Sequence, residues 1–243
     1  MNSHLNNTAY DGFESDFSNH KEDAYRKSKI EDVQKNIYRI KKLFDKKITV
    51  LDVGSGNSKF LYSLYDHGLL NLGYGVEVSK SRVEFANKWQ KELGIDNVGN
   101  INCNFFDLDL RALPKFDLVY CSDVVFQFFD PANKNDDNKF LERIYKRLNP
   151  GGKILLELGT HDAIIQSMTN GAVKFWTEFE ESDPWRYMLW DCRYDNSYIT
   201  LNKIFIKRDL SSISDNTVIL KRYTRDEASR LLSNANYSDI KIF

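Results

Sequence analysis

The sequence predicts an α/β fold: a doubly wound, mostly parallel sheet of seven strands with helices on both faces, an antiparallel last strand, and an inserted antiparallel hairpin after the fifth strand. Apolar residues at helical three- and four-residue steps alternate along the chain with short apolar runs, which is typical of parallel strands connected by helices. With 243 residues, 42% of them apolar and 28% charged, the chain is long enough to bury such a core without disulfides or metals.

The regular alternation covers residues 23–158. A first helix is expected over residues 23–45, where apolar residues recur at helical steps with charged residues between them. Strands are then expected at Ile48–Leu51, Gly73–Val78, Ile101–Phe105, Phe116–Cys121 and Lys153–Leu158. Helices are expected at Lys59–Leu69, at 80–93 between an N-cap at Ser79 and a stop at Gly94, and at Phe140–Leu148.

The last third of the sequence lacks this alternation of helices and strands. Two extended stretches, Trp190–Asn196 and Tyr198–Lys207, predict an antiparallel hairpin. A strand at Thr217–Arg222, a helix at Arg225–Ser233 and a closing strand at Asp239–Phe243 then complete the expected sheet. No linker separates these elements, so we expect one domain over residues 47–243, with an insertion at about residues 162–212 that forms a lid.

Charge and composition argue against several classes of protein. The 34 basic and 35 acidic residues give a net charge of −1, whereas nucleic-acid binders usually carry a basic surface. No run approaches the roughly 18 apolar residues of a membrane helix, and the N-terminus lacks a signal-peptide pattern. The three cysteines, Cys103, Cys121 and Cys192, have no CxxC spacing, so we expect reduced thiols in a cytoplasmic protein, without a disulfide framework or a metal site.

The most specific local pattern runs from Val50 to Ser58, where a buried strand leads into a tight glycine turn and then a helix. Nucleotides bind at the first such crevice of doubly wound sheets, and Glu77 at the end of the next strand suits two ribose hydroxyls. Asp52 lies two residues before the first glycine. An acid there would repel a pyrophosphate but attract the amino group of a methionine-like cofactor, which favours S-adenosylmethionine over NAD.

At this point the sequence resembles the class I S-adenosylmethionine-dependent methyltransferases, from about Val50 to Leu158. The matching motifs are Asp52-x-Gly54-x-Gly56, Gly75-Val76-Glu77-Val78-Ser79, Asn104-Phe105-Phe106-Asp107, Phe116-Asp117-Leu118-Val119 and Leu148-Asn149-Pro150-Gly151-Gly152-Lys153. Ser58 replaces the family's common third glycine. The resemblance implies that cofactor contacts come from Asp52, Gly54, Gly56, Glu77, Val78, Asn104, Phe105 and Ser122. Either Asn104 or Asp107 takes the adenine-contacting position, and Tyr10 belongs to an N-terminal arm and helix over residues 1–46 that cover the site.

Residues that follow the fourth and fifth strands are the candidates for the acceptor side. His161 is the best candidate for a general base, since it lies on a strand-end loop and its unperturbed pKa is about 6.5. Many members of the family have a histidine where this chain has Gln127, which is no base but is able to hydrogen-bond the acceptor. Asp123 and Glu157 are secondary candidates.

The layout predicts transfer of a methyl group to an oxygen or nitrogen of a small molecule such as a sugar, a nucleotide-linked sugar or a natural product. Aromatic residues crowd residues 175–206, where they wall an acceptor pocket or pack beneath the hairpin. Two other functions stay open, an NAD-binding oxidoreductase and a non-catalytic subunit that binds S-adenosylmethionine. We expect a monomer or homodimer without nucleic-acid or membrane partners.

Overall fold

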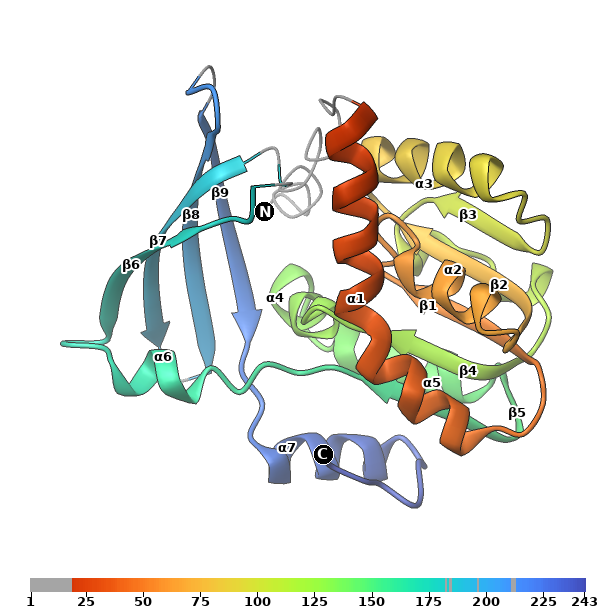
Figure 1. Ribbon diagram of the computed structural model, residues 1–243. Helices are drawn as coiled ribbons and strands as arrows, with labels where there is room; N and C mark the ends of the chain where they lie inside the picture. The colour runs from red at the N-terminus through yellow and green to blue at the C-terminus, as the bar shows by residue number, and fades with distance from the viewer. Residues whose placement is uncertain (1–18, 182, 184, 196, 211–212) are drawn as a thin grey trace. The chain divides into compact units, whose positions relative to one another are not determined.

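The computed structural model describes residues 19–181, 183, 185–195, 197–210 and 213–243 (Figure 1). The chain divides into two compact units. Of the described residues, 19–122 and 147–156 form the parallel-sheet unit, and 123–146 together with those from 157 to 243 form the antiparallel-sheet unit.

The parallel-sheet unit is built on five parallel strands in the order β3-β2-β1-β4-β5. The strands are β1 (Ile48–Val53), β2 (Leu70–Glu77), β3 (Val98–Asn102), β4 (Phe116–Cys121) and β5 (Leu148–Leu156). Asp52 on β1 is opposite Gly75 on β2, and Glu77 at the end of β2 is opposite Asn102 on β3. The parallel register therefore brings the carboxyl ends of adjacent strands, and the residues that follow them, to one edge of the sheet.

Three helices share one apolar core with this sheet: α1 (Asn19–Leu43), α2 (Lys59–Asp66) and α3 (Lys80–Leu93). The predicted stripe of α1 is confirmed, because Val33, Ile37 and Ile40 are all buried in that core. The predicted limits of α3 are confirmed too, since the Ser79 side chain accepts from the first turn and Gly94 ends the helix in the left-handed region. Among the described residues, no helix is both long enough and apolar enough to cross a membrane.

The antiparallel-sheet unit contains a four-stranded sheet in the order β6-β7-β8-β9. Its strands are β6 (Ala172–Glu178), β7 (Trp185–Asp195), β8 (Tyr198–Lys207) and β9 (Ile213–Lys221). The helical segments are η3 (Val125–Phe128), α4 (Phe129–Ala132), α5 (Asp136–Tyr145), α6 (Asp162–Gln166) and α7 (Arg225–Asn234). One face of the sheet is apolar and buried, as the alternating buried residues Ile199, Leu201 and Phe205 of β8 show.

An aromatic cluster joins the helices of this unit to the segment after β9. The ring of Phe126 lies 5.6 Å from the rings of both Phe140 and Tyr223, measured between centroids. All three side chains are buried. The carboxyl end of β9 is thereby packed against η3 and α5.

The two sheets correct the expectation of a single seven-stranded sheet. The predicted hairpin is present as β7 and β8, but the predicted strand Thr217–Arg222 falls mainly within β9, which pairs antiparallel with β8. A segment that follows a hairpin so closely in sequence readily becomes its next strand. Residues 239–243 form no strand, because Asp239 adopts a φ of 52° that turns the chain out of an extended path.

The third strand is also displaced from its expected position. It ends at Asn102, and Phe105 instead begins a 3-10 turn, η1 (Phe105–Asp107), which is followed by η2 (Leu110–Ala112). Asn104 favours the turn because its side chain accepts a hydrogen bond from the backbone N–H of Phe106 at 2.9 Å. The bounds of β4 and β8 match their predicted limits.

Candidate active site

The glycine turn after β1 folds back onto the neighbouring strand β2. The backbone N–H groups of Gly54 and Ser55 both donate to the carbonyl of Val76, at 2.8 and 3.1 Å. Gly54 and Gly56 lie in the left-handed region, with φ of 73° and 55°. That region favours glycine, so the two glycines of the motif are needed for the path of the turn itself.

Ser58, which stands in place of a third glycine, is also left-handed, with a φ of 60°. Its side chain is fully buried, and its hydroxyl donates to Oδ1 of Asn100 on β3 at 2.6 Å. Gly75 on β2 makes room for this arrangement, because a Cβ there would lie 2.7 Å from the Ser55 hydroxyl and 3.0 Å from the Ser58 hydroxyl. The left-handed conformation is unfavourable for a serine, and the same residue makes a favourable hydrogen bond to Asn100.

Two buried acids lie at the ends of adjacent strands. Glu77 is 7% exposed, and its two carboxylate oxygens accept hydrogen bonds from the backbone N–H groups of Gly56 and Ser79, each at 2.9 Å. Each oxygen keeps a further lone pair for a ligand. Asp52, on β1, is 3% exposed. The edge of the sheet thus presents two carboxylates beside a glycine turn.

The residues predicted after β3 and β4 lie at the same edge of this unit. Phe105 and Ser122 are buried, whereas Asn104 and Asp107 are exposed. The Oδ1 atom of Asn104 accepts from the N–H of Phe106, so the side chain already has a local structural role. The choice between Asn104 and Asp107 for an adenine contact stays a prediction.

Two further residues at this edge were absent from the sequence prediction. The guanidinium of Arg82 lies over Gly56, where a Cβ would come within 2.6 Å of Nη2. Asn102 donates from Nδ2 to the carbonyls of Glu77 and Val78, at 2.9 and 3.0 Å. Arg82 had a sequence signal, since a residue in the first turn of α3 lies near the end of β2. Asn102 had none, because its contacts depend on strand register.

His161, in the antiparallel-sheet unit, lies in the left-handed region just before α6, with a φ of 56°. Its Nε2 atom is buried and has no hydrogen-bond partner among the described residues. Burial lowers the pKa of His161, the positive charges of Lys203 and Arg222 lower it further, and Asp162 opposes them. The imidazole is therefore neutral at pH 7, which is the form that accepts a proton.

Gln127 and Glu157 differ in their surroundings. Gln127 is fully buried, and its amide group binds the backbone of Gly159 and Lys221. Both of its N–H groups are used there, so no donor is left for an acceptor molecule. Glu157 follows β5 directly and is exposed.

Tyr10 and most of the predicted N-terminal arm lie outside the described residues, so the covering role of residues 1–46 stays a prediction.

The chain is strained just after β4. Asp123 and Val124 both adopt left-handed backbone conformations, with φ of 52° and 59°. A β-branched residue rarely does so, and such conformations cluster at functional sites. The expectation of functional residues after the fourth strand stays a prediction.

A family model described as a methyltransferase domain matches residues 44–191, more than half of the chain. The chain belongs to the methyltransferase-domain family. The predicted resemblance to methyltransferases is thereby confirmed.

Solved structures share the fold of this methyltransferase. The CcbJ methyltransferase from Streptomyces caelestis matches with a TM-score of 0.67 and 18% identity over 84% of this chain and 78% of that chain. CalS10 from Micromonospora echinaspora, an amino pentose methyltransferase involved in calicheamicin biosynthesis, matches with a TM-score of 0.63 and 16% identity over 90% of this chain and 89% of that chain. At these identities the likeness shows the α/β fold.

Curated relatives match a smaller part of the methyltransferase. A tRNA (guanine-N(7)-)-methyltransferase from Synechococcus sp. (strain JA-3-3Ab) is 29% identical over 140 residues, which cover 54% of this chain and 58% of that protein. The chain spans about half the length of the curated relatives it matches.

Proposed function

We propose that this methyltransferase transfers a methyl group from S-adenosylmethionine to an amine or hydroxyl of a small, sugar-like molecule. The observation that carries the cofactor part is the pair of buried carboxylates, Asp52 and Glu77, beside the glycine turn. Glu77 suits ribose hydroxyls, and Asp52 discriminates between the two cofactors, because an acid beside the glycine turn would attract an ammonium group but repel the pyrophosphate of NAD.

Different residues of the parallel-sheet unit would bind different groups of the cofactor. Asp52 would attract the ammonium group, and the remaining lone pairs of Glu77 would accept from ribose hydroxyls. Phe105 and Ser122 would line the adenosine side, with Asn104 or Asp107 at the adenine amino group. When bound, S-adenosylmethionine supplies an electrophilic methyl group, whose bond to sulfur breaks as the bond to the acceptor forms.

His161 is our candidate for the proton acceptor. A protonated amine has no lone pair for attack, so its proton must leave before or during transfer. A neutral imidazole with an unpartnered Nε2 suits that step. Glu157, exposed after β5, is the alternative base.

The proposed acceptor class rests on three observations. CalS10, whose name states an amino pentose substrate, matches 90% of this chain, whereas the tRNA methyltransferase matches 54%. The net charge of −1 also disfavours a tRNA surface. The aromatic residues of β6 and β7 supply ring faces of the kind that stack on sugars, including the parallel pair Phe175 and Trp190 at 5.4 Å.

A methyl-transfer assay by mass spectrometry tests the proposal with three acceptor groups: amino sugars, neutral sugars and an unmodified tRNA transcript. We expect methylated product from the amino sugars, little product from Asp52→Ala, and slow turnover with unchanged cofactor affinity from His161→Ala. The variant Glu84→Gln is the control, because the Glu84 side chain is 64% exposed. Methylation of the tRNA alone would contradict the acceptor class, and normal turnover in His161→Ala would remove His161 as the base.

A further inference from the structure

Gln127 joins three segments of the antiparallel-sheet unit through its side-chain amide. Oε1 accepts from the backbone N–H of Gly159 at 2.7 Å, and Nε2 donates to the carbonyl of Gly159 at 3.1 Å. Nε2 also donates to the carbonyl of Lys221, at the end of β9, at 2.7 Å. Because both the N–H and the carbonyl of Gly159 bind one buried side chain, the orientation of this residue's backbone is fixed.

The ring of His161 rests on this fixed backbone. A Cβ on Gly159 would lie 2.8 Å from Nε2 of His161 and 3.2 Å from Cγ1 of Val124. A side chain larger than that of glycine at this position would displace the ring from its place beside the strained residue Val124. The position of the imidazole therefore depends directly on the position of Gly159.

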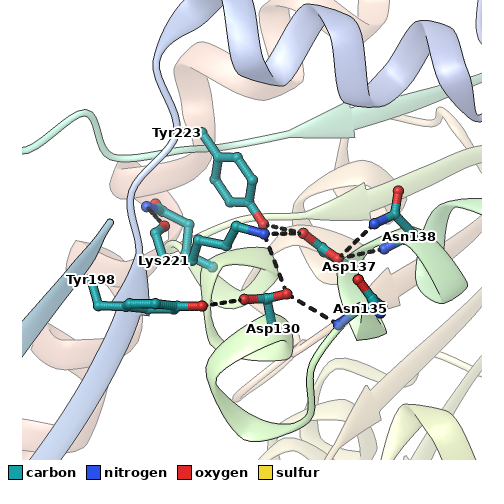
Figure 2. A network of polar contacts seen from close by, with 8 residues as sticks. Asp130, Asn135, Asp137, Asn138, Tyr198, Lys221 and Tyr223 are labelled. Carbon is teal, nitrogen blue, oxygen red and sulfur yellow. Dashed lines mark hydrogen bonds and ion pairs between the residues drawn. The ribbon is translucent and has the colours of Figure 1, made fainter. Parts of the chain in front are cut away.

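The side chain of Lys221 lies within a network of polar contacts, as Figure 2 shows. Its ammonium group lies 2.9 Å from Oδ2 of Asp137 and 3.3 Å from Oδ1 of Asp130. Tyr223 donates to Asp137 at 2.7 Å, and Tyr198 donates to Asp130 at 2.8 Å. Since both acids are buried, the end of β9 is tied to α4 and α5 by a network whose rupture would leave charges unpaired.

We propose that Gln127 is a positioning residue: it connects the anchored end of β9 to Gly159, and thereby holds the imidazole of His161 in the orientation that proton transfer requires. The inference rests on the proposed function, in which His161 accepts the proton. Gln127 acts through His161 and touches neither substrate nor cofactor in this account. This replaces the earlier expectation that Gln127 hydrogen-bonds the acceptor.

The variant Gln127→Met tests the proposal, because methionine is nearly isosteric but makes none of the three hydrogen bonds. We expect kcat to fall by about tenfold or more, while the dissociation constant of S-adenosylhomocysteine stays within about twofold. The matched control is Gln166→Met on the exposed side of α6, which we expect to leave kcat unchanged.

A second readout follows the histidine itself, by NMR titration of its ring in the folded protein. Burial and the charges of Lys203 on β8 and Arg222 after β9 lower the pKa of His161, and Asp162 on α6 opposes them. Release of the ring toward water in Gln127→Met should move the pKa up toward its ordinary value and speed exchange of the Gly159 amide proton. The variant Gly159→Ala keeps Gln127 but displaces the ring, so it should lower kcat in the same way even if Gln127→Met fails to fold.

The two readouts separate failure of the inference from failure of the proposed function. A folded Gln127→Met with wild-type kcat and an unchanged His161 pKa would overturn the inference. A wild-type protein without methyl transfer, in which Gln127→Met still shifts the His161 pKa, would overturn the proposed function but keep the positioning contact. Equal losses of kcat and of cofactor affinity would show a general structural role instead, and would also overturn the inference.

Discussion

The backbone N–H of Gly56 donates to Oε2 of Glu77 at 2.9 Å, which joins the glycine turn after β1 to the acid at the end of β2. The other oxygen of Glu77 accepts from the N–H of Ser79 at the start of α3. One carboxylate thus sets the relative positions of a turn, a strand end and a helix N-terminus. The side chain proposed to bind the cofactor ribose is therefore also part of the local structure.

We expect Glu77→Gln to weaken binding of S-adenosylhomocysteine by about tenfold or more, equivalent to about 1.4 kcal/mol. The new amide nitrogen would face one of two backbone N–H donors, so one donor loses its acceptor and the charge is lost as well. Isothermal titration calorimetry measures the effect. The exposed control Glu84→Gln should bind as the wild type does, and a wild-type affinity in Glu77→Gln would contradict the assigned role of this acid.

Ser58 allows a test of the turn that is independent of any ligand. We expect Ser58→Ala to lower the free energy of unfolding by about 1–2 kcal/mol, because it keeps the left-handed backbone but loses the hydrogen bond to Asn100. Ser58→Gly should cost less, since glycine relieves the backbone strain. Urea unfolding of the two variants gives the comparison, and a larger loss for the glycine variant would contradict it.

Lys221→Met should lower the free energy of unfolding by about 3 kcal/mol or more, because Asp130 and Asp137 would stay buried without their shared cation. Lys139→Met is the control. Its ammonium group pairs with Asp136 at 2.7 Å, but its side chain is 55% exposed, so the loss should be below about 1 kcal/mol. Similar losses in the two variants would mean that the Lys221 network carries little stability.

Stability should also fall in acid through Asp130. Burial alone would raise the pKa of Asp130, but hydrogen bonds from Tyr198 and Asn135 and the charge of Lys221 outweigh it and hold the pKa below its ordinary value. The folded state then binds this proton less tightly than the unfolded state does, so stability is present above about pH 4 and is lost as the pH falls further. Urea unfolding between pH 3 and 6 measures how the free energy of unfolding depends on pH, and this dependence should be less steep in Asp130→Asn than in the wild type. An equally steep dependence in the two proteins would contradict the role given to Asp130.

The glycine turn after β1 and the acid at the end of β2 could be predicted from the sequence because their signals are local. Gly54 and Gly56 follow an apolar run directly, and Glu77 closes the next one. The parallel register then brings these strand ends together without further information. The strands of the parallel sheet were found for the same reason, although the third and the start of the fifth were placed a few residues late.

The sheet to which β9 belongs and the contacts of Gln127 and Lys221 depend on pairing between residues that are distant in sequence. Whether β9 joins the first sheet or extends the second is decided by its pairing with β8, which the residues of β9 do not reveal by themselves. The contacts of Lys221 with Asp137 and of Gln127 with Lys221 span 84 and 94 residues of sequence. Gln127 therefore looked like a candidate ligand contact in the sequence, whereas the structure gives it backbone partners.

The most direct test of the central claim is calorimetric titration of the purified protein with S-adenosylhomocysteine and, in parallel, with NAD. We expect micromolar binding of S-adenosylhomocysteine and no binding of NAD, because Asp52 suits an ammonium group but would repel a pyrophosphate, while Glu77 suits ribose hydroxyls. Binding of NAD alone would contradict the assignment of the glycine turn. The proposals for His161 and Gln127 as parts of a methyl-transfer site would then fall with it.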